Sequence, residues 1–363
     1  MNSFASAFPD ERSSSMNLSL SNLFEPIADE LAETISLYRE TVLRTAERNY
    51  LHTLISGGVP YLPEEFRIAT ADRIAEHLLE SDGKWIRSAL VLLTANACGF
   101  NGLPARQVAA AVEMIHMATL VHDDIIDEAP MRRGVEAVHW HWGNSIAVLL
   151  GDFLFSKAFK LLLASGSLPS QSLLTQATGQ MCLGEIKELV ISDQGLISEK
   201  DYMEMIENKT ASLMAAASAS GAHLGGLDSR LAECMHAYGH AVGIAFQITD
   251  DVLDFTAPTS ILGKEQGWDM RNGKTTLPLI HLLHNDGVAA RGILESSQPF
   301  EEKAARLLSL MNEMGSIDYA YDAASRYGAI AKNNLAEVEK VAGSSHSIHS
   351  LNNLVDFILI RER

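Results

Sequence analysis

The sequence is poor in cysteine and in positive charge, and each shortage excludes a class of protein. Only three cysteines occur, so far apart that they form neither a disulfide framework nor a zinc-site spacing. A reducing, cytoplasmic location is therefore expected. Lys and Arg number 28 against 46 Asp and Glu, for a formal net charge of -18. A chain this acidic should not bind nucleic acid through its general charge, and an anionic substrate would need local cations or metal ions.

Long apolar runs and nucleotide-binding loops are also missing. No stretch of about 18 apolar residues occurs, so no transmembrane segment is expected. The N-terminus lacks the basic region and apolar core of a signal peptide. Residues 1–17 are rich in Ser and are interpreted as a disordered tail, which leaves 18–363 as the folded domain. Neither GxxxxGK[ST] nor GxGxxG after a strand is found, so a bound diphosphate would not belong to a nucleotide.

Helical periodicity is what the sequence does contain, along almost the whole chain after residue 18. Alternating strand patterns are scarce and short, and no linker exceeds the length of a normal loop. The segments 104–127 and 231–255 are apolar nearly all round, which is typical of central helices. The pattern predicts an all-α fold with one large helical domain.

Each of these two central segments ends in an acidic cluster, where carboxylates are disfavoured by the helix dipole and costly to bury unpaired. The two clusters are Asp123, Asp124 and Asp127, and Asp250, Asp251 and Asp254. Within each, the outer pair is spaced i, i+4 and projects from one helix face. Mg²⁺ takes such oxygen ligands together with substrate phosphate oxygens. One cluster could be a solvated helix end, but two, each followed by Ala-Pro, favour a metal site.

Cations lie beside Gly turns and beside the acidic clusters, where their charge and the backbone N–H groups suit phosphate binding. They are Lys84, Arg87, Arg132, Arg133, Lys209, Lys264 and Lys274. Each alone would be read as a solvated surface residue. Together with two carboxylate pairs, they predict a site for one or two diphosphates.

Five motifs resemble, in order and spacing, those of the trans-isoprenyl diphosphate synthases over about residues 20–363: "HDDIIDEAPMRRG", "GNSIAVLLGD", "NKTASL", "FQITDDVLDF" and "GKTTLPL". The resemblance implies the isoprenoid synthase fold, with helices around a deep central cavity, and a homodimer. It also implies head-to-tail condensation of isopentenyl diphosphate with an allylic diphosphate. The cofactor it implies is Mg²⁺, about three ions per active site, or Mn²⁺ in its place.

The resemblance also assigns roles to residues. It makes Asp123, Asp127 and Asp250 the metal ligands, and adds to the catalytic group Asp124, Asp251, Asp254 and Lys209. The allylic diphosphate is assigned to Arg132, Lys209, Thr210, Gln247, Lys264 and Lys274. Isopentenyl diphosphate is assigned to Lys84, Arg87, His116 and Arg133. His116 lies two helical turns before Asp123 and faces the same side, although it could instead be a core histidine.

One stretch departs from the family pattern GGKRxRP around the isopentenyl site. The chain has Asp82-Gly83-Lys84-Trp85-Ile86-Arg87-Ser88 there. The Lys and the second Arg are kept, but the first Gly, the first Arg and the Pro are not. Loss of one cation predicts weaker binding of isopentenyl diphosphate, and Trp85 is expected to pack.

Product length is predicted from the residues that precede the first acidic cluster. One turn before it lie Ala118 and Thr119, and one turn further Ile115, which should form the floor beneath the carboxylates. Ala118 and Thr119 are too small to block a growing chain, so an all-trans product of about 30 to 50 carbons, of the quinone side-chain type, is expected. Such a product would be delivered to a membrane.

Four other interpretations remain. A farnesyl or geranylgeranyl diphosphate synthase would differ only in product length. A terpene cyclase would carry Asn, Ser/Thr and Glu at the second metal motif, where this chain has "DDVLD". A head-to-head synthase would show a different acidic pattern. A non-catalytic helical partner subunit would be expected to lose aspartates, yet all six are present.

Overall fold

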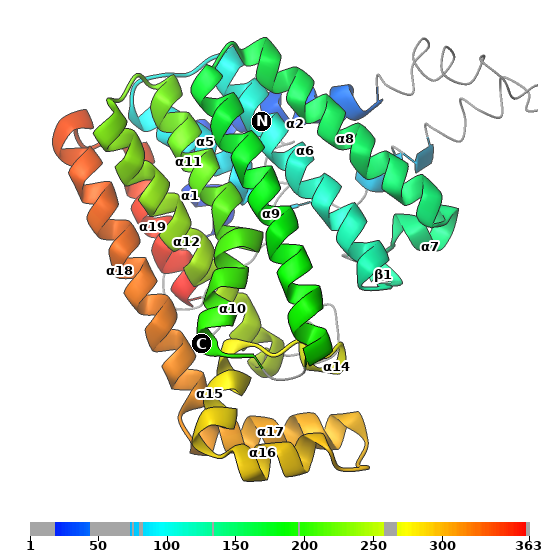
Figure 1. Ribbon diagram of the computed structural model, residues 1–363. Coiled ribbons are helices and arrows are strands. Elements are labelled where there is room, and N and C mark those ends of the chain that lie inside the picture. Colours follow the sequence, from blue (N-terminus) through cyan, green and yellow to red (C-terminus); the bar gives the residue numbers. More distant parts are fainter. Residues whose placement is uncertain are drawn as a thin grey trace, which may run out of the picture.

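The structure is a computed structural model that describes residues 19–43, 73–74, 76–79, 83–132, 134–194, 197–257 and 267–360. The tail predicted over 1–17 and the predicted diphosphate contacts Arg133 and Lys264 lie outside these residues. Within them the all-α prediction is confirmed (Figure 1). Strand is confined there to a small antiparallel hairpin of β1 (Met131–Arg132) and β2 (Val135–Glu136).

The first half of the bundle combines short helices with four long ones. The short helices are α1 (Leu20–Leu23), the 3-10 helix η2 (Glu25–Ile27), α5 (Ile86–Ala97) and α7 (Val138–Trp142). The long helices are α2 (Ala28–Leu43), α6 (Leu103–Ile126), α8 (Asn144–Ser165) and α9 (Leu168–Gln194).

The second half begins with a helical segment that changes its winding along the way. It runs without a break through α10 (Glu199–Ile206), a π-helical turn η3 (Glu207–Ala211) and α11 (Ser212–Leu224). The remaining helices are α12 (Ser229–Thr256), α14 (Trp268–Arg271), α15 (Leu277–Asn285), α16 (Gly287–Leu294), α17 (Phe300–Glu313), α18 (Ser316–Ala342) and α19 (His346–Ile360).

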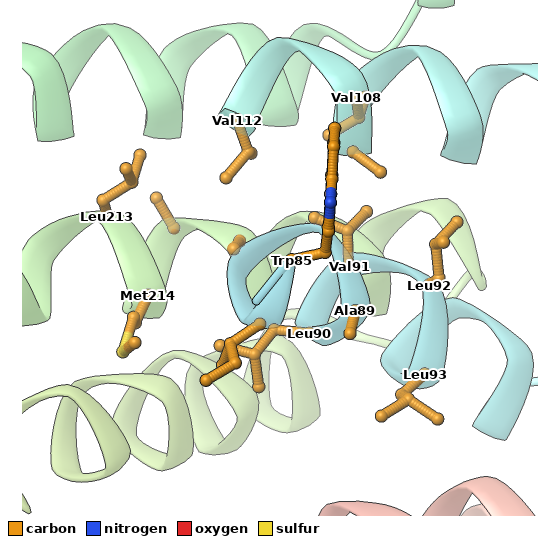
Figure 2. Packing of buried hydrophobic residues seen from close by; sticks show 14 of the residues in the cluster. Trp85, Ala89, Leu90, Val91, Leu92, Leu93, Val108, Val112, Leu213 and Met214 are labelled. Atoms are coloured by element: carbon orange, nitrogen blue, oxygen red, sulfur yellow. The ribbon is translucent and has the colours of Figure 1, made fainter. Parts of the chain in front are cut away.

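A first hydrophobic core surrounds α5, which packs against α6 on one side and α11 on another. Figure 2 shows Leu90 and Val91 of α5 in this core with Val112 of α6 and Leu213 of α11, and all four side chains are fully buried. Since α6 is apolar nearly all round, it can be buried on every side, as its sequence predicts. This core holds the end of α6, and hence the first acidic cluster, in a fixed place.

A second core lies toward the other end of the bundle, where α15, α16 and α17 are found at the bottom of Figure 1. It gathers Tyr202 of α10, Leu282 of α15 and Met311 of α17 around the last turns of α12. The 28 residues of α12 span about 42 Å, so that Tyr238 belongs to the first core and Ile248 to the second. The second acidic cluster is thus fixed on a helix that both cores hold.

None of the helices in the described ranges combines the length and the apolar character that crossing a membrane requires.

Candidate active site

The end of α6 carries the first acidic cluster, as predicted. Asp127 is the C-cap, and its backbone N–H donates to the carbonyl of Asp123 at 2.7 Å. Pro130 cannot continue the helix, and the β1–β2 hairpin that follows turns the chain back. The hairpin brings Arg132 onto Asp124, with Nε donating to Oδ1 at 2.8 Å. Asp124 is buried, so this pairing supplies the charge that a buried carboxylate requires.

Lys209 and Thr210 lie on the π-helical turn η3, a rare winding that is common at functional sites. Two glycines allow neighbouring helices to touch this turn. A Cβ on Gly184 of α9 would lie 2.7 Å from the backbone N of Lys209, and one on Gly243 of α12 would lie 2.6 Å from Cα of Ala211. The turn is therefore held between α9 and α12 at backbone contact, which places Lys209 beside the carboxylates of α9.

Two lysines join the end of α6 to α9 through three carboxylates. Lys209 Nζ lies 2.5 Å from Oε2 of Glu185 and also contacts Glu188. Lys274 Nζ lies 3.0 Å from Oδ2 of Asp127 and 3.3 Å from Oε1 of Glu188. Side chains that are far apart in sequence thus form one mixed-charge cluster.

A hydrogen-bond chain connects η3 to the second acidic cluster. Thr210 Oγ1 donates to Oε1 of Gln247 at 2.8 Å, and Gln247 Nε2 donates to Oδ1 of Asp251 at 2.8 Å. The other oxygen of Asp251 accepts from the hydroxyl of the fully buried Tyr202 at 2.6 Å. Burial raises the pKa of the Asp251 carboxyl well above its ordinary value, and both of its oxygens are engaged.

The other two members of the second cluster differ in position. Asp254 is 1% exposed, and its Oδ2 accepts from the backbone N–H of Asp269 at 3.2 Å. The carbonyl of Asp269 in turn accepts from the backbone N–H of Lys274 at 2.9 Å, so Asp254 fixes the turn that presents Lys274. Asp250 is half-buried near the end of α12.

The electrostatics show a carboxylate in need of a counter-charge. Burial raises the pKa of Asp123 to about 7. Repulsion from Glu185 and Asp127 adds to this rise, and Lys209 and Arg132 oppose it. Burial acts to raise the pKa of Glu188 as well, but Lys209 and Lys274 together hold it below its ordinary value. Burial acts to lower the pKa values of both lysines, and the surrounding carboxylates raise them instead. Both lysines therefore stay charged.

A cavity of about 140 Å³ opens at this cluster. Its polar lining includes Glu188, Lys209, Thr210, Gln247, Asp251 and Lys274. Part of its apolar lining comes from Ile191, Ile197, Met205 and Ile206. Cationic and apolar surfaces therefore meet in one space, as an amphiphilic diphosphate ester requires.

The residues assigned to isopentenyl diphosphate lie at the start of α5 and on α6. Arg87 Nη1 lies 3.2 Å from Nε2 of His116, which is 8% exposed, and Lys84 is half-buried. Trp85 packs as expected: it is 5% exposed and meets the Tyr38 ring edge-on at a centroid distance of 5.2 Å. Its φ of 53° is left-handed, a strained conformation for a bulky residue.

The predicted floor of the product cavity lies inside the protein. Ala118 and Ile115 are fully buried in the first core, and the Thr119 hydroxyl donates to the carbonyl of His116 at 2.8 Å. The 140 Å³ cavity does not reach these three residues. Their role in product length stays a prediction.

Sequence reasoning missed several members of the site, among them Glu185, Glu188 and Tyr202. The two glutamates are spaced i, i+3 after Gly184 in the stretch "MCLGEIKELV", which is otherwise apolar except for Lys187, and that spacing was a usable signal. Nothing in the sequence marked Tyr202, because a single aromatic residue on a short amphipathic helix is usually a core residue.

The donor set fits a hard divalent cation. The carboxylates at and beside the cavity offer oxygen ligands, and burial together with the repulsion from Glu185 and Asp127 raises the pKa of Asp123, which a nearby cation would oppose. Across the described ranges, no three side chains of His, Cys, Asp or Glu are already gathered around one point. A cation would therefore be held by Asp123, Asp127 and Asp250 only together with other oxygens, such as those of a diphosphate.

The model of the polyprenyl synthetase family matches residues 69–314. The chain belongs to that family. Its members are the trans-isoprenyl diphosphate synthases, so the prediction of a prenyltransferase is confirmed. A geranylgeranyl diphosphate synthase from Methanosarcina mazei is 38% identical over 260 residues, covering 70% of this chain and 80% of the relative. Component 2 of heptaprenyl diphosphate synthase from Geobacillus stearothermophilus is 35% identical over 256 residues, covering 70% and 79%.

A solved family structure supports the same fold. The polyprenyl synthase from Caulobacter crescentus, in complex with calcium and isoprenyl diphosphate, superposes with a TM-score of 0.81 at 32% identity. The match covers 94% of this chain and 97% of that one. This family member thus has the isoprenoid synthase fold predicted from its motifs.

Proposed function

We propose that the protein condenses isopentenyl diphosphate with an allylic diphosphate, head to tail, in a reaction that depends on Mg²⁺. The observation that carries this proposal is that Lys209, Lys274 and Asp251 of the second acidic cluster line one partly apolar cavity, while Lys274 also pairs with Asp127 of the first cluster. The Caulobacter relative, with calcium and isoprenyl diphosphate bound, supports the use of a divalent cation. We assign about three Mg²⁺ ions to the site, with Mn²⁺ able to replace them.

The residues have distinct tasks in this reaction. Lys209, Lys274 and Arg132 bind the allylic diphosphate and stabilise the charge that grows on it as it leaves. Bound Mg²⁺ adds Lewis-acid stabilisation of the same charge. Apolar residues such as Ile206 exclude water from the allylic cation. The double bond of isopentenyl diphosphate, held by Lys84, Arg87 and His116, attacks that cation, and the departed diphosphate accepts the proton that is lost.

We propose a long-chain product, of about 30 to 50 carbons, delivered from a cytoplasmic enzyme to a membrane. The relatives include a geranylgeranyl and a heptaprenyl synthase, so the support comes from the small side chains at Ala118 and Thr119. A geranylgeranyl-type product is the alternative. A long-chain product requires a product cavity that extends further along α6 beyond the acidic cluster than a geranylgeranyl-type product does.

We propose that the enzyme works as a homodimer through α8 and α9. Both helices expose large apolar side chains at helical spacing: Ile146, Leu149 and Leu163 on α8, and Leu183, Ile186 and Val190 on α9. Exposed large apolar side chains in such number on two neighbouring helices are typical of an interface. The Geobacillus relative is named as a component, so a different partner subunit is the alternative.

One experiment tests the reaction and separates it from its rivals. The protein is incubated with labelled isopentenyl diphosphate, a farnesyl or geranylgeranyl primer, and either Mg²⁺ or EDTA, and the products are sized by chromatography. We expect labelled polyprenyl product with Mg²⁺ and none with EDTA. A cyclase would consume the primer without incorporating label. Absence of incorporation with every primer would contradict the proposal.

A further inference from the structure

Glu188 occupies an unusual position between the two lysines of the site. Its Oε2 contacts Nζ of Lys209, and its Oε1 lies 3.3 Å from Nζ of Lys274. Each oxygen of one carboxylate is therefore engaged by a different ammonium group. The Glu188 side chain is only 12% exposed, which makes both pairs strong relative to surface pairs.

Carboxylates outnumber the ammonium groups around the two lysines. Lys209 is also paired with Glu185 at 2.5 Å, and Lys274 with Asp127 at 3.0 Å. Asp123 lies close enough to repel both Glu185 and Asp127. Three carboxylates thus pair with two ammonium groups, with Asp123 nearby, and Arg132 is already bonded to Asp124. A diphosphate without a metal ion would enter a site of excess negative charge and would find both lysines taken.

Glu188 differs from its neighbour Glu185 in two ways. Glu188 contacts both lysines whereas Glu185 contacts one, and Glu188 lines the cavity. Gly184 fixes its place, because the backbone contact there keeps α9 against the π-helical turn that carries Lys209. Glu188 is therefore the carboxylate that an entering diphosphate must displace from the lysines.

We infer that Glu188 withholds Lys209 and Lys274 from a metal-free diphosphate, so that the site accepts a diphosphate only as its complex with a divalent cation. The inference rests on the proposed diphosphate-binding function. A divalent cation that enters with the diphosphate offsets the carboxylate charge, and the lysines can then turn from Glu188 to the phosphate oxygens. The carboxylate thereby excludes free diphosphates that would otherwise occupy the lysines unproductively.

The test measures binding of inorganic diphosphate by calorimetry, in EDTA and in Mg²⁺, to wild type and to Glu188→Gln. Gln keeps the size of Glu but removes its charge, and it leaves one acceptor oxygen where Glu188 offers two. We expect wild type to bind the Mg²⁺ complex at least about 100-fold more tightly than the metal-free ion. In Glu188→Gln we expect metal-free binding to strengthen about tenfold or more, so the metal dependence shrinks.

Glu204→Gln is the matched control. It removes the same charge from α10, where Glu204 pairs with Lys187 at 2.7 Å. We expect its two affinities to equal those of wild type. The inference is overturned if Glu188→Gln binds metal-free diphosphate no better than wild type, if Glu204→Gln gains as much, or if wild type shows no metal dependence. Failure of the proposed reaction would appear separately, as binding of the Mg²⁺ complex without incorporation of isopentenyl diphosphate.

Discussion

Single residues carry the charge balance of this site, and Asp123 shows its weak point. Its neighbours Glu185 and Asp127 repel it, and Lys209 only partly compensates for burial. Without a cation, such a carboxyl is partly protonated near neutral pH. Proton and metal ion should therefore compete for Asp123.

The first prediction follows from that competition. Burial raises the pKa of Asp123 from 3.8 to about 7 in the folded, metal-free protein. Its protonated form therefore stabilises the fold fully below pH 3.8, and this contribution is lost as the pH rises through about 7. Mg²⁺ should bind roughly tenfold more weakly at pH 6 than at pH 8, since most Asp123 is protonated at pH 6.

Thermal melts with and without Mg²⁺ at the two pH values measure this effect. We expect a larger Mg²⁺-induced rise in Tm at pH 8 than at pH 6. Asp123→Asn serves as the control, because it cannot titrate and should show a small rise that is the same at both values. An equal rise in wild type at pH 6 and pH 8 would contradict the assignment.

The second prediction concerns product length at Ala118. A Phe side chain at this position should extend into the path of the growing chain and shorten the product to about 15 to 20 carbons. Since Ala118 is fully buried, the larger side chain should also cost about 1–3 kcal/mol of stability. Chromatography of the products and a urea melt measure the two effects. An unchanged product from a folded variant would mean that the floor lies elsewhere.

The positions of the helices were easier to predict from the sequence than the type of helical turn, α or π, within them. The sequence pattern predicted that two apolar helices end in the two acidic clusters, and α6 and α12 confirm both predictions. The helical periodicity of the sequence predicted ordinary helix in this part of the chain, whereas the structure winds Glu207–Ala211 as the π-helical turn η3. The turn is held by contacts with α9 and α12, which no local pattern contains.

The third prediction tests how α9 meets this turn. In Gly184→Ala, the new Cβ would lie 2.7 Å from the backbone N of Lys209, so α9 must move away and carry Glu185 and Glu188 with it. We expect a loss of about 1–3 kcal/mol in the free energy of unfolding and a higher KM for the allylic diphosphate.

Gly179→Ala on the same helix is the matched control. No atom lies within 4 Å of the Cβ it would add, so the better helix propensity of Ala should leave stability unchanged or raised by about 1 kcal/mol. Urea unfolding and steady-state kinetics on both variants decide the matter. Equal stability and equal KM in the two variants would show that the close approach is unimportant.

The fourth prediction belongs to the whole molecule and its assembly. The proposed dimer interface consists of the exposed apolar side chains of α8 and α9, called here the apolar stripe. If this stripe is the interface, Ile186→Glu should dissociate the dimer, and light scattering should then give the mass of one chain. Val288→Glu on α16 is the control, since Val288 is 89% exposed but stands outside the stripe, and it should leave the dimer intact. A wild-type protein with the mass of one chain would contradict the proposal.

The sequence by itself determined the helical class, the two acidic helix ends and the family, because each of these depends only on the spacing of residues and the order of motifs along the chain. Only the tertiary structure decided which charges meet. Lys209 and Glu188 are far apart in the chain and become partners because Gly184 and Gly243 let three helices approach at backbone distance. Asp251 similarly acquires Tyr202 only through packing of α10 on α12. Spacing along a helix fixes the direction of a side chain, but its partner depends on what packs against that face.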